Sequence, residues 1–370
     1  MSELHSYEAP VIFEKKALAS KNTFLGCIHL NAPKSFNSLT LIMVQEIQKQ
    51  LNEWRDDKSI AALFLDGEGE KAFCAGGDVK GLFNGRVDSA GKIDNPSAIN
   101  FFDQEYTLDY CLHAYPKPII CWANGVVMGG GLGLMAACVH RVVTETTRSA
   151  MPEITIGLFP DVGGSWFLNR CPGKTGLFLG LTGVSINAHD AIYSRLANRF
   201  IADTYKSEVF SALLKLSDAD IQNGKITECL KGFEQNSLHK LPTSELKQHA
   251  SFIESVCDYE KLSDMVAAIV NQASTHQSTW LQSAAKTLAQ GCPITAHLVF
   301  EQLQRGKYLS LREVFVMERK ISAQCMRHGD FYEGVRALLI DKDKNPQWTH
   351  KNVAEVGEEF LKPYFYSELP

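Results

Sequence analysis

Two carboxylates stand out because they lie in a segment that is rich in glycine and proline and has almost no other charge. They are Glu153 and Asp161, within residues 151–164, MPEITIGLFPDVGG. Burying an unpaired carboxylate is costly, and an apolar environment raises the pKa of a carboxyl group toward the range in which it exchanges protons. The segment therefore predicts an acid–base or nucleophilic site, although two helix-capping carboxylates would give the same pattern.

Two glycine-rich segments could present backbone N–H groups to a substrate oxygen. They are residues 71–80, KAFCAGGDVK, and residues 124–133, NGVVMGGGLG. Glycine allows the backbone to approach a ligand closely, and N–H groups at a turn or a helix start can bind an oxyanion. Lys80 could reach a phosphate. Ordinary glycine turns would explain the same residues, and the spacing is not the G-x-G-x-x-G of dinucleotide sites.

The elements that would position these segments alternate between strand and helix. Continuous apolar runs at 24–30, 61–65 and 118–123 predict strands buried in a parallel sheet, and 141–145 predicts a further short strand. Apolar residues recur every three or four positions from Leu39 to Trp54, which predicts a helix capped by Ser38 or Thr40. A second helix is expected over 98–113, after a surface loop at 85–96.

The chain changes character after about residue 204. Amphipathic helices are predicted at 206–216, 244–257, 261–272, 279–288, 294–304 and 312–326. We therefore expect an α/β region at 10–204 that carries the site, and a mainly helical region at 205–370.

Composition excludes several classes of partner. With 37 basic and 42 acidic residues among 370, the net charge of -5 gives no electrostatic attraction for nucleic acid or an anionic membrane. No apolar run is long enough to span a bilayer. The ten cysteines contain no C-x-x-C pair, so neither a metal site nor a disulfide framework is expected. The first ten residues lack the features of a targeting segment, which together with the cysteines predicts a cytoplasmic protein.

The motifs together resemble the crotonase superfamily of acyl-coenzyme A enzymes. They are CAGGD at 74–78, MGGGLG at 128–133, and PE at 152–153 followed by GLFPDVGG at 157–164. The similarity covers roughly 25–199 and returns at 329–343, GDFYEGVRALLIDKD. It implies a crotonase-like spiral of ββα units, in which helices cover a twisted, mostly parallel sheet, with a helical region at the C-terminal end. Within the family, the chain is most similar to the branch that hydrolyses short 3-hydroxyacyl-CoA esters in valine catabolism.

The resemblance also implies roles for individual residues. Gly77 and Gly130 match the positions whose N–H groups hold the thioester oxygen, and Glu153 matches the main catalytic carboxylate. Asp161 and Glu105 match acidic positions that contact the substrate, although a solvated position on a helix would also explain Glu105. Lys80 matches a position near the coenzyme A phosphates. No separate cofactor is implied, because coenzyme A is part of the substrate.

Three functions remain open at this stage. The first is the hydrolase, and the second is an enoyl-CoA hydratase or isomerase. The hydratases of the family use two glutamates, and the position of the first is Gly133 here, which disfavours hydration. The third is a non-catalytic acyl-CoA-binding protein. Crotonases often form trimers, so a homo-oligomer is also a possible state.

Overall fold

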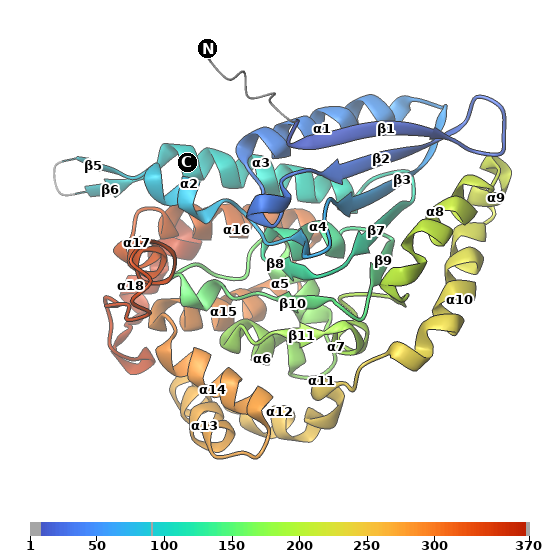
Figure 1. Cartoon of the computed structure of the whole chain (residues 1–370). Helices are drawn as coiled ribbons and strands as arrows, with labels where there is room; N and C mark the ends of the chain where they lie inside the picture. The colour runs from blue at the N-terminus through green and yellow to red at the C-terminus, as the bar shows by residue number, and fades with distance from the viewer. Residues whose placement is uncertain (1–8, 90–91, 368–370) are drawn as a thin grey trace, which may run out of the picture.

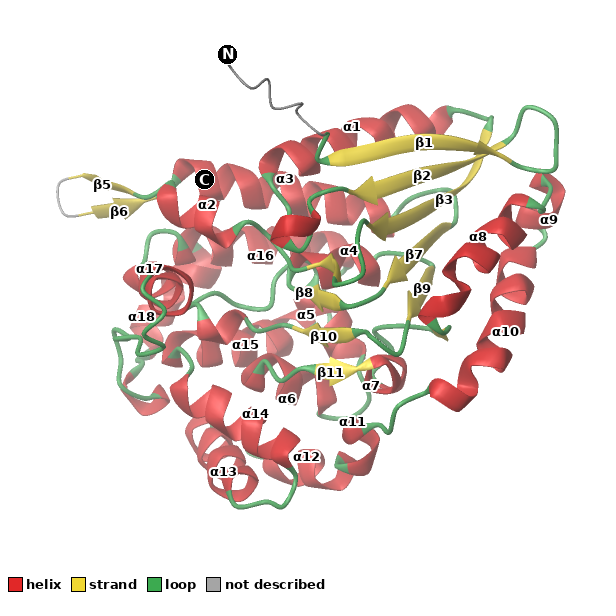
Figure 2. Ribbon diagram, viewed as in Figure 1, coloured by secondary structure: helices red, strands yellow, loops and turns green. Residues whose placement is uncertain are grey.

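The computed structural model of the chain describes residues 9–89 and 92–367, and its larger sheet has six strands (Figures 1 and 2). The strand order is β1-β2-β3-β7-β9-β12. The pair β1–β2 is antiparallel and the other neighbours are parallel, which confirms the expected parallel sheet. The strands are β1 (Val11–Ala17), β2 (Phe24–Leu30), β3 (Ile60–Gly67), β7 (Ile119–Ala123), β9 (His140–Val143) and β12 (Arg199–Phe200).

A smaller sheet of order β11-β10-β8-β4 carries the loops that matter for the site. Its strands are β4 (Ala72–Cys74), β8 (Val126–Met128), β10 (Arg148–Ala150) and β11 (Ile186–Asn187). Since β4, β8 and β10 are parallel, their carboxyl ends meet at one edge. These ends lead into Gly76 and Gly77, into Gly129 and Gly130, and toward Glu153. Segments far apart in the sequence therefore converge at a single edge.

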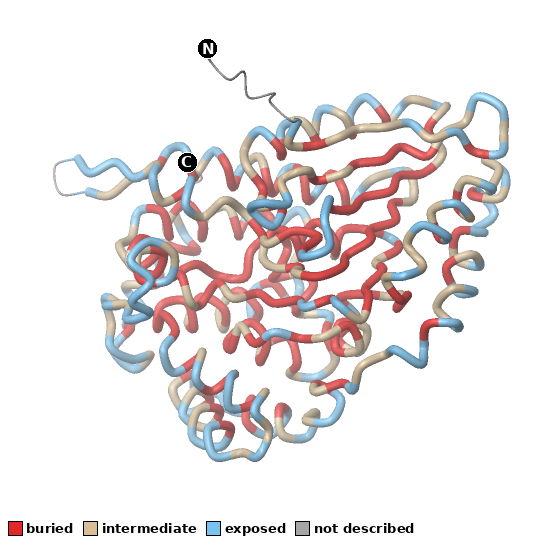
Figure 3. Tube along the Cα trace, in the orientation of Figure 1, coloured by how far each residue is buried: buried red, intermediate tan, exposed pale blue. Residues whose placement is uncertain are grey.

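Helices cover both faces of the large sheet, and most of its inner strands are buried (Figure 3). The side chains of β3 point alternately into two apolar clusters. Leu63 and Leu65 belong to the larger cluster, with α1 (Leu41–Asp56) and α3 (Pro96–His113). Ala62 and Phe64 belong to the smaller cluster, with α8 (Lys206–Leu214), α9 (Asp218–Gln222) and α10 (Lys225–Ser237). Both faces of β3 are therefore covered by apolar side chains, which explains why its sequence is a continuous apolar run.

The C-terminal helices share the larger core with the sheet. That cluster includes side chains from Val11 to Phe365. Within it, α15 (Pro293–Gly306) packs on α6 (Thr175–Thr182), and α16 (Leu311–Cys325) packs on α3. The division at residue 204 stays a prediction. The further helices are α11 (Glu245–Gln248), α12 (Ala250–Val256), α13 (Leu262–Ser274), α14 (Thr279–Gln290), α15 (Pro293–Gly306), α16 (Leu311–Cys325), α17 (Gly329–Val335) and α18 (Glu358–Tyr366).

The sequence-based expectations need four local corrections. The helix expected over 244–257 is two helices, which are separated at His249. The expected loop at 85–96 contains a hairpin of β5 (Val87–Ser89) and β6 (Lys92–Asp94), and its residues 90–91 lie outside the described part. The strand β1 was not predicted, because an edge strand carries charged side chains that weaken the apolar signal. Ile42, assigned to the apolar face of α1, is 48% exposed, whereas Thr40 caps that helix as expected.

Within residues 9–89 and 92–367, no helix combines the length and the apolar character that crossing a membrane requires.

Candidate active site

Two glycine turns lie against each other at the edge of the small sheet. A Cβ atom added at Gly76 would lie 3.1 Å from the Met128 carbonyl oxygen and 3.5 Å from the Gly130 nitrogen. Gly130 is the first residue of α4 (Gly130–Ala136), and Gly129 before it has a φ of 48°, which favours glycine. Among the hydrogen bonds of the described residues, neither the Gly77 nor the Gly130 N–H donates to a protein acceptor. Both amides are therefore free to bind a substrate oxygen.

Two buried glutamates contact the second of these turns. Glu105 on α3 is 2% exposed, and a Cβ atom at Gly130 would lie 2.4 Å from its Oε1. Glu153, in a short 3-10 turn at Glu153–Thr155, is 5% exposed, and a Cβ atom at Gly129 would lie 3.1 Å from its Oε1. The two carboxyl groups thus occupy the space that side chains would take at 129 and 130. Glu105 is not the solvated helix residue that its pattern also allowed.

Asp161 joins this group from the turn after Pro160. It is 4% exposed, and the Tyr106 hydroxyl donates a hydrogen bond of 2.7 Å to its Oδ2. Burial raises the pKa of Asp161 to about 7, although the Tyr106 hydrogen bond favours the ionised form. Asp161 can therefore gain or lose a proton near neutral pH.

The neighbouring carboxyl groups are shifted in the same direction. Burial raises the pKa of Glu153 and of Glu105 well above the ordinary range, and the charge of Asp161 is the second cause for both. Asp109 lies one helical turn after Glu105, is fully buried, and has its pKa raised by burial and then by Glu105. Protons in such a cluster belong to the group as a whole, because ionising one carboxyl group makes the next harder to ionise.

The structure therefore brings together five of the six residues proposed from the sequence, namely Gly77, Glu105, Gly130, Glu153 and Asp161. The sixth, Lys80, is exposed in the first turn of α2 (Val79–Asn84), directly after the glycines at 76 and 77. It lies at the surface rather than among the carboxyl groups.

Sequence reasoning missed three residues of this site: Tyr106, Asp109 and Glu318. Asp109 had a usable signal, because it lies four residues after Glu105 and therefore on the same helix face. Glu318 on α16 is fully buried and accepts hydrogen bonds from the Gly163 and Ser165 backbone N–H groups, at 2.8 and 2.9 Å. Its signal was a charge among the apolar residues of a predicted amphipathic helix.

Gly133 explains how this site differs from one with a second glutamate on α4. A Cβ atom at Gly133 would lie 2.6 Å from the Val162 Cβ. A glutamate here would therefore have to displace Val162, next to Asp161. The structure has no space for the additional carboxylate that the family's hydratases use.

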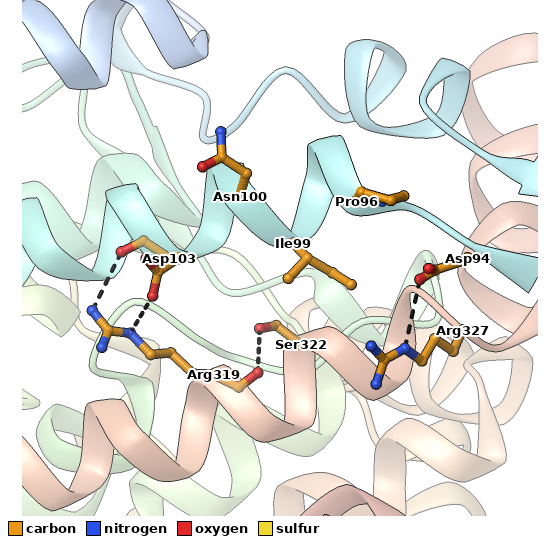
Figure 4. Close-up of a pocket in the computed structure, with 8 residues that line it drawn as sticks. All are labelled: Asp94, Pro96, Ile99, Asn100, Asp103, Arg319, Ser322 and Arg327. Atoms are coloured by element: carbon orange, nitrogen blue, oxygen red, sulfur yellow. Dashed lines mark hydrogen bonds and ion pairs between the residues drawn. The ribbon is translucent and has the colours of Figure 1, made fainter. Parts of the chain in front are cut away.

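A hollow of about 400 Å³ between α3 and α16 lies outside this group of carboxyl groups (Figure 4). Arg319 lies 3.0 Å from Asp103 in it, and Arg327 lies 3.5 Å from Asp94. The first ion pair connects α16 to α3. The second connects the segment just after α16 to the segment just before α3. The lining residues are Asp94, Pro96, Ile99, Asn100, Asp103, Arg319, Ser322 and Arg327.

Comparison with known proteins identifies relatives over almost the whole chain. A protein of Danio rerio named "3-hydroxyisobutyryl-CoA hydrolase, mitochondrial" is 38% identical over 96% of this chain and 89% of its own length. The Homo sapiens protein of the same name is 35% identical over 95% of this chain and 89% of its own length. These names contradict the expected cytoplasmic location, because they place the relatives in mitochondria. Residues 1–8, on which that expectation partly rested, lie outside the described part, and free cysteines do not distinguish one reducing compartment from another.

Solved structures confirm the expected crotonase-like α/β fold with its helical C-terminal region. A structure titled enoyl-CoA hydratase from Rhodobacter sphaeroides 2.4.1 has a TM-score of 0.82 and 31% identity, and covers 97% of each chain. One titled carnitinyl-CoA dehydratase from Mycobacterium thermoresistibile has a TM-score of 0.84 and 32% identity, and covers 98% of each chain. A family model described as enoyl-CoA hydratase/isomerase matches residues 25–365, so the similarity includes the helical region as well. The chain belongs to the enoyl-CoA hydratase/isomerase family.

Proposed function

We propose that the chain hydrolyses the thioester of a short 3-hydroxyacyl-CoA, most simply 3-hydroxyisobutyryl-CoA, to the free hydroxy acid and coenzyme A. The names of the relatives described above support this substrate. The observation that carries the proposal is the position of Asp161. Its carboxyl group accepts a hydrogen bond from Tyr106 and lies near Glu153, and both carboxyl groups adjoin the two glycine turns with free N–H groups. Asp161 offers a polar partner for a β-hydroxyl, which a simple acyl chain lacks.

The first step is polarisation of the thioester carbonyl. The Gly77 and Gly130 N–H groups would donate to its oxygen and stabilise the negative charge that develops there. Both donors are fixed in turns before the reaction, so they need no reorganisation when the charge appears. Removing one such donor typically costs about 3–4 kcal/mol in the barrier.

The second step divides acid and base roles between two carboxyl groups. Glu153 would act as a nucleophile through an acyl-enzyme anhydride, or as a base on water, and needs to be ionised for either role. The charge of Asp161 is one cause of its raised pKa, so a proton on Asp161 makes Glu153 easier to ionise. Asp161 can then give its proton to the sulfur as the C–S bond breaks and the new C–O bond forms. On the anhydride route, water would then attack the anhydride, give a proton to Asp161, and release the hydroxy acid and the Glu153 carboxylate. Glu105, beside Gly130, would contact the acyl group.

The coenzyme A part of the substrate would lie along the outside of the same loops. A hollow of about 450 Å³ there has Lys34 and Lys71 in its lining, with Phe36, which is 43% exposed. The Ala75 N–H donates to the Phe36 carbonyl at 3.0 Å, so this hollow adjoins the glycine turn. Lysines suit phosphates and an exposed ring can stack on adenine, and Lys80 lies on the next helix. Its lining residues are Pro33, Lys34, Phe36, Asn37, Glu68, Gly69, Glu70, Lys71 and Ala72.

An enoyl-CoA hydratase or isomerase is the second candidate, because the solved relatives carry such titles. The contact between Gly133 and Val162 speaks against hydration, since it leaves no space for a second glutamate on α4. A non-catalytic binding protein would not need Glu153, Glu105 and Asp161 together in one buried cluster, because such burial is costly.

Release of free thiol from purified acyl-CoA esters tests the proposal. The panel is 3-hydroxyisobutyryl-, 3-hydroxypropionyl-, acetyl- and crotonyl-CoA, followed with a thiol reagent. We expect fast release from the two 3-hydroxyacyl esters alone. A change in crotonyl-CoA absorbance without thiol release would favour the hydratase or isomerase, and silence in both assays would indicate binding without chemistry.

A further inference from the structure

The turn that carries Asp161 has an unfavourable backbone conformation. Val162 has a φ of 50° and Gly163 a φ of 86°. The left-handed region is open to glycine, but a β-branched residue such as valine is a genuine outlier there. Such a conformation persists only where surrounding contacts enforce it, and it is common at functional sites. The contacts that enforce it here therefore determine where Asp161 points.

Glu318 supplies two of those contacts from 155 residues away in the sequence. Its Oε2 accepts from the Gly163 N–H at 2.8 Å, and its Oε1 accepts from the Ser165 N–H at 2.9 Å. The side chain is fully buried, so water does not compete for these bonds. A carboxyl group with both oxygens engaged fixes the direction of the turn better than a single bond would.

The other side of Asp161 is held from the same helical region. Gln302 on α15 is fully buried, and its Nε2 donates to the Pro160 carbonyl at 3.0 Å. The backbone is therefore fixed immediately before Asp161 by α15 and immediately after Val162 by α16. The carboxyl group itself is held from the α/β region, through Tyr106 on α3.

The helix α16 is in turn fixed against α3. Arg319, next to Glu318, lies 3.0 Å from the Asp103 carboxylate (Figure 4). Arg319 also donates to the Thr107 hydroxyl at 2.8 Å. Asp103 and Thr107 are on the helix that also carries Glu105 and Tyr106. The position of Glu318 is therefore set relative to Glu105 and Tyr106 on α3.

We propose that Glu318 is a positioning residue that directs Asp161 toward the substrate hydroxyl, so that the C-terminal helices determine the preference for 3-hydroxyacyl esters. This inference rests on the role proposed for Asp161 above. Glu318 itself contacts backbone amides rather than substrate. Its effect should therefore appear as a loss of selectivity and should depend on the presence of Asp161.

A double-mutant cycle tests this dependence. The variants are Asp161→Asn, Glu318→Gln and both together. The measured quantity is the ratio of kcat/KM for 3-hydroxyisobutyryl-CoA to that for isobutyryl-CoA, which lacks the hydroxyl. A glutamine can accept only one of the two N–H bonds, and we expect Glu318→Gln to lower the ratio about tenfold, the size of one lost hydrogen bond. In the Asp161→Asn background it should lower the ratio no further, because residues that act through one another are not additive.

The possible failures are distinguishable. If Asp161→Asn leaves the ratio unchanged, the role proposed for Asp161 is wrong. If Asp161→Asn lowers the ratio but Glu318→Gln slows both substrates equally, the positioning role is wrong. It is also wrong if Glu318→Gln lowers the ratio in the Asp161→Asn background as much as it does in the wild type. Glu318→Asp provides a second variant should glutamine prevent folding, because it keeps the carboxyl group but is too short to hold both N–H groups. Glu313→Gln, an exposed change on the same helix, is the matched control and should leave the ratio unchanged.

Discussion

Glu153, in its short turn, and Glu318, on its helix, are both buried glutamates, but they differ in their hydrogen bonds. Both glutamates are buried, at 5% and 0% exposure. Both oxygens of Glu318 accept backbone hydrogen bonds, whereas Oε2 of Glu153 has no partner among the described residues. Burial alone therefore does not identify the reactive group. A carboxyl group whose bonds are complete holds a loop in place, and one with free capacity is available for chemistry.

The largest difference between the two should appear when each is replaced by glutamine. Glu153→Gln should lower kcat by about 10³-fold, within the range for loss of a general acid or base, because an amide is neither nucleophile nor base. The free energy of unfolding should not fall, because the neutral amide of glutamine replaces a carboxyl group that is costly to ionise in the interior. Thiol release gives kcat, and thermal unfolding of the same preparations gives the stability.

Glu318→Gln should have the opposite effects on activity and stability. We expect a smaller loss of kcat than in Glu153→Gln and a lower midpoint of thermal unfolding. The exposed replacement Glu313→Gln serves as the control for both. Full activity in Glu153→Gln would show that Glu153 is not the catalytic carboxyl group.

The sequence alone was sufficient for the parts of the site that are local. Glu153 and Asp161 stand out as carboxylates in a segment rich in glycine and proline. The resemblance selects Gly77 and Gly130 within the two glycine-rich segments, and parallel strands bring such strand ends together. The buried strands were recognisable for a similar reason, since β3 is apolar on both faces.

The remaining contacts depend on tertiary packing that no local pattern encodes. The Tyr106 hydroxyl meets Asp161 across 55 residues, and Glu318 meets Gly163 across 155. In the sequence, Tyr106 is one aromatic residue among several and Glu318 is one charge on an amphipathic helix. The partner of each becomes clear only when α3 and α16 are packed on the turn at 161–165.

The second prediction concerns the glycine turn beside Glu105. A Cβ atom at Gly130 would lie 2.4 Å from the Glu105 Oε1, so Gly130→Ala must move the carboxyl group or the amide. We expect kcat for thiol release to fall by about 10²-fold, as for loss of one oxyanion donor.

Gly232→Ala is the matched control. Gly232 lies inside α10, and an added Cβ atom there would meet nothing within 4 Å. This change should leave kcat unaltered and raise the free energy of unfolding by about 0.5–1 kcal/mol, because alanine is more stable than glycine in the interior of a helix. An equal loss of activity in both variants would show that the effect at Gly130 is not specific to the turn.

The third prediction concerns the pH dependence of stability. Burial raises the pKa of Glu318 to about 8, although its two N–H bonds favour the ionised form, and the pKa of Asp161 to about 7. Between the ordinary carboxyl range near pH 4 and these values, the folded protein binds more protons than the unfolded chain. The free energy of unfolding should therefore fall as the pH rises through this window, by up to about 1.4 kcal/mol per pH unit for each proton.

Glu318→Gln and Asp161→Asn should each reduce that slope, because neither amide titrates. Denaturant unfolding from pH 5 to pH 8 measures it. In Glu313→Gln the slope should remain the same as in the wild type. Hydrogen bonds from Ser310 lower the pKa of Glu313, so its contribution to the free energy of unfolding changes with pH only below pH 5. A slope that is the same in wild type and in Glu318→Gln would mean that Glu318 is already ionised throughout this range. The two backbone N–H bonds would then outweigh its burial, and Glu318 would hold the Asp161 turn as a full charge.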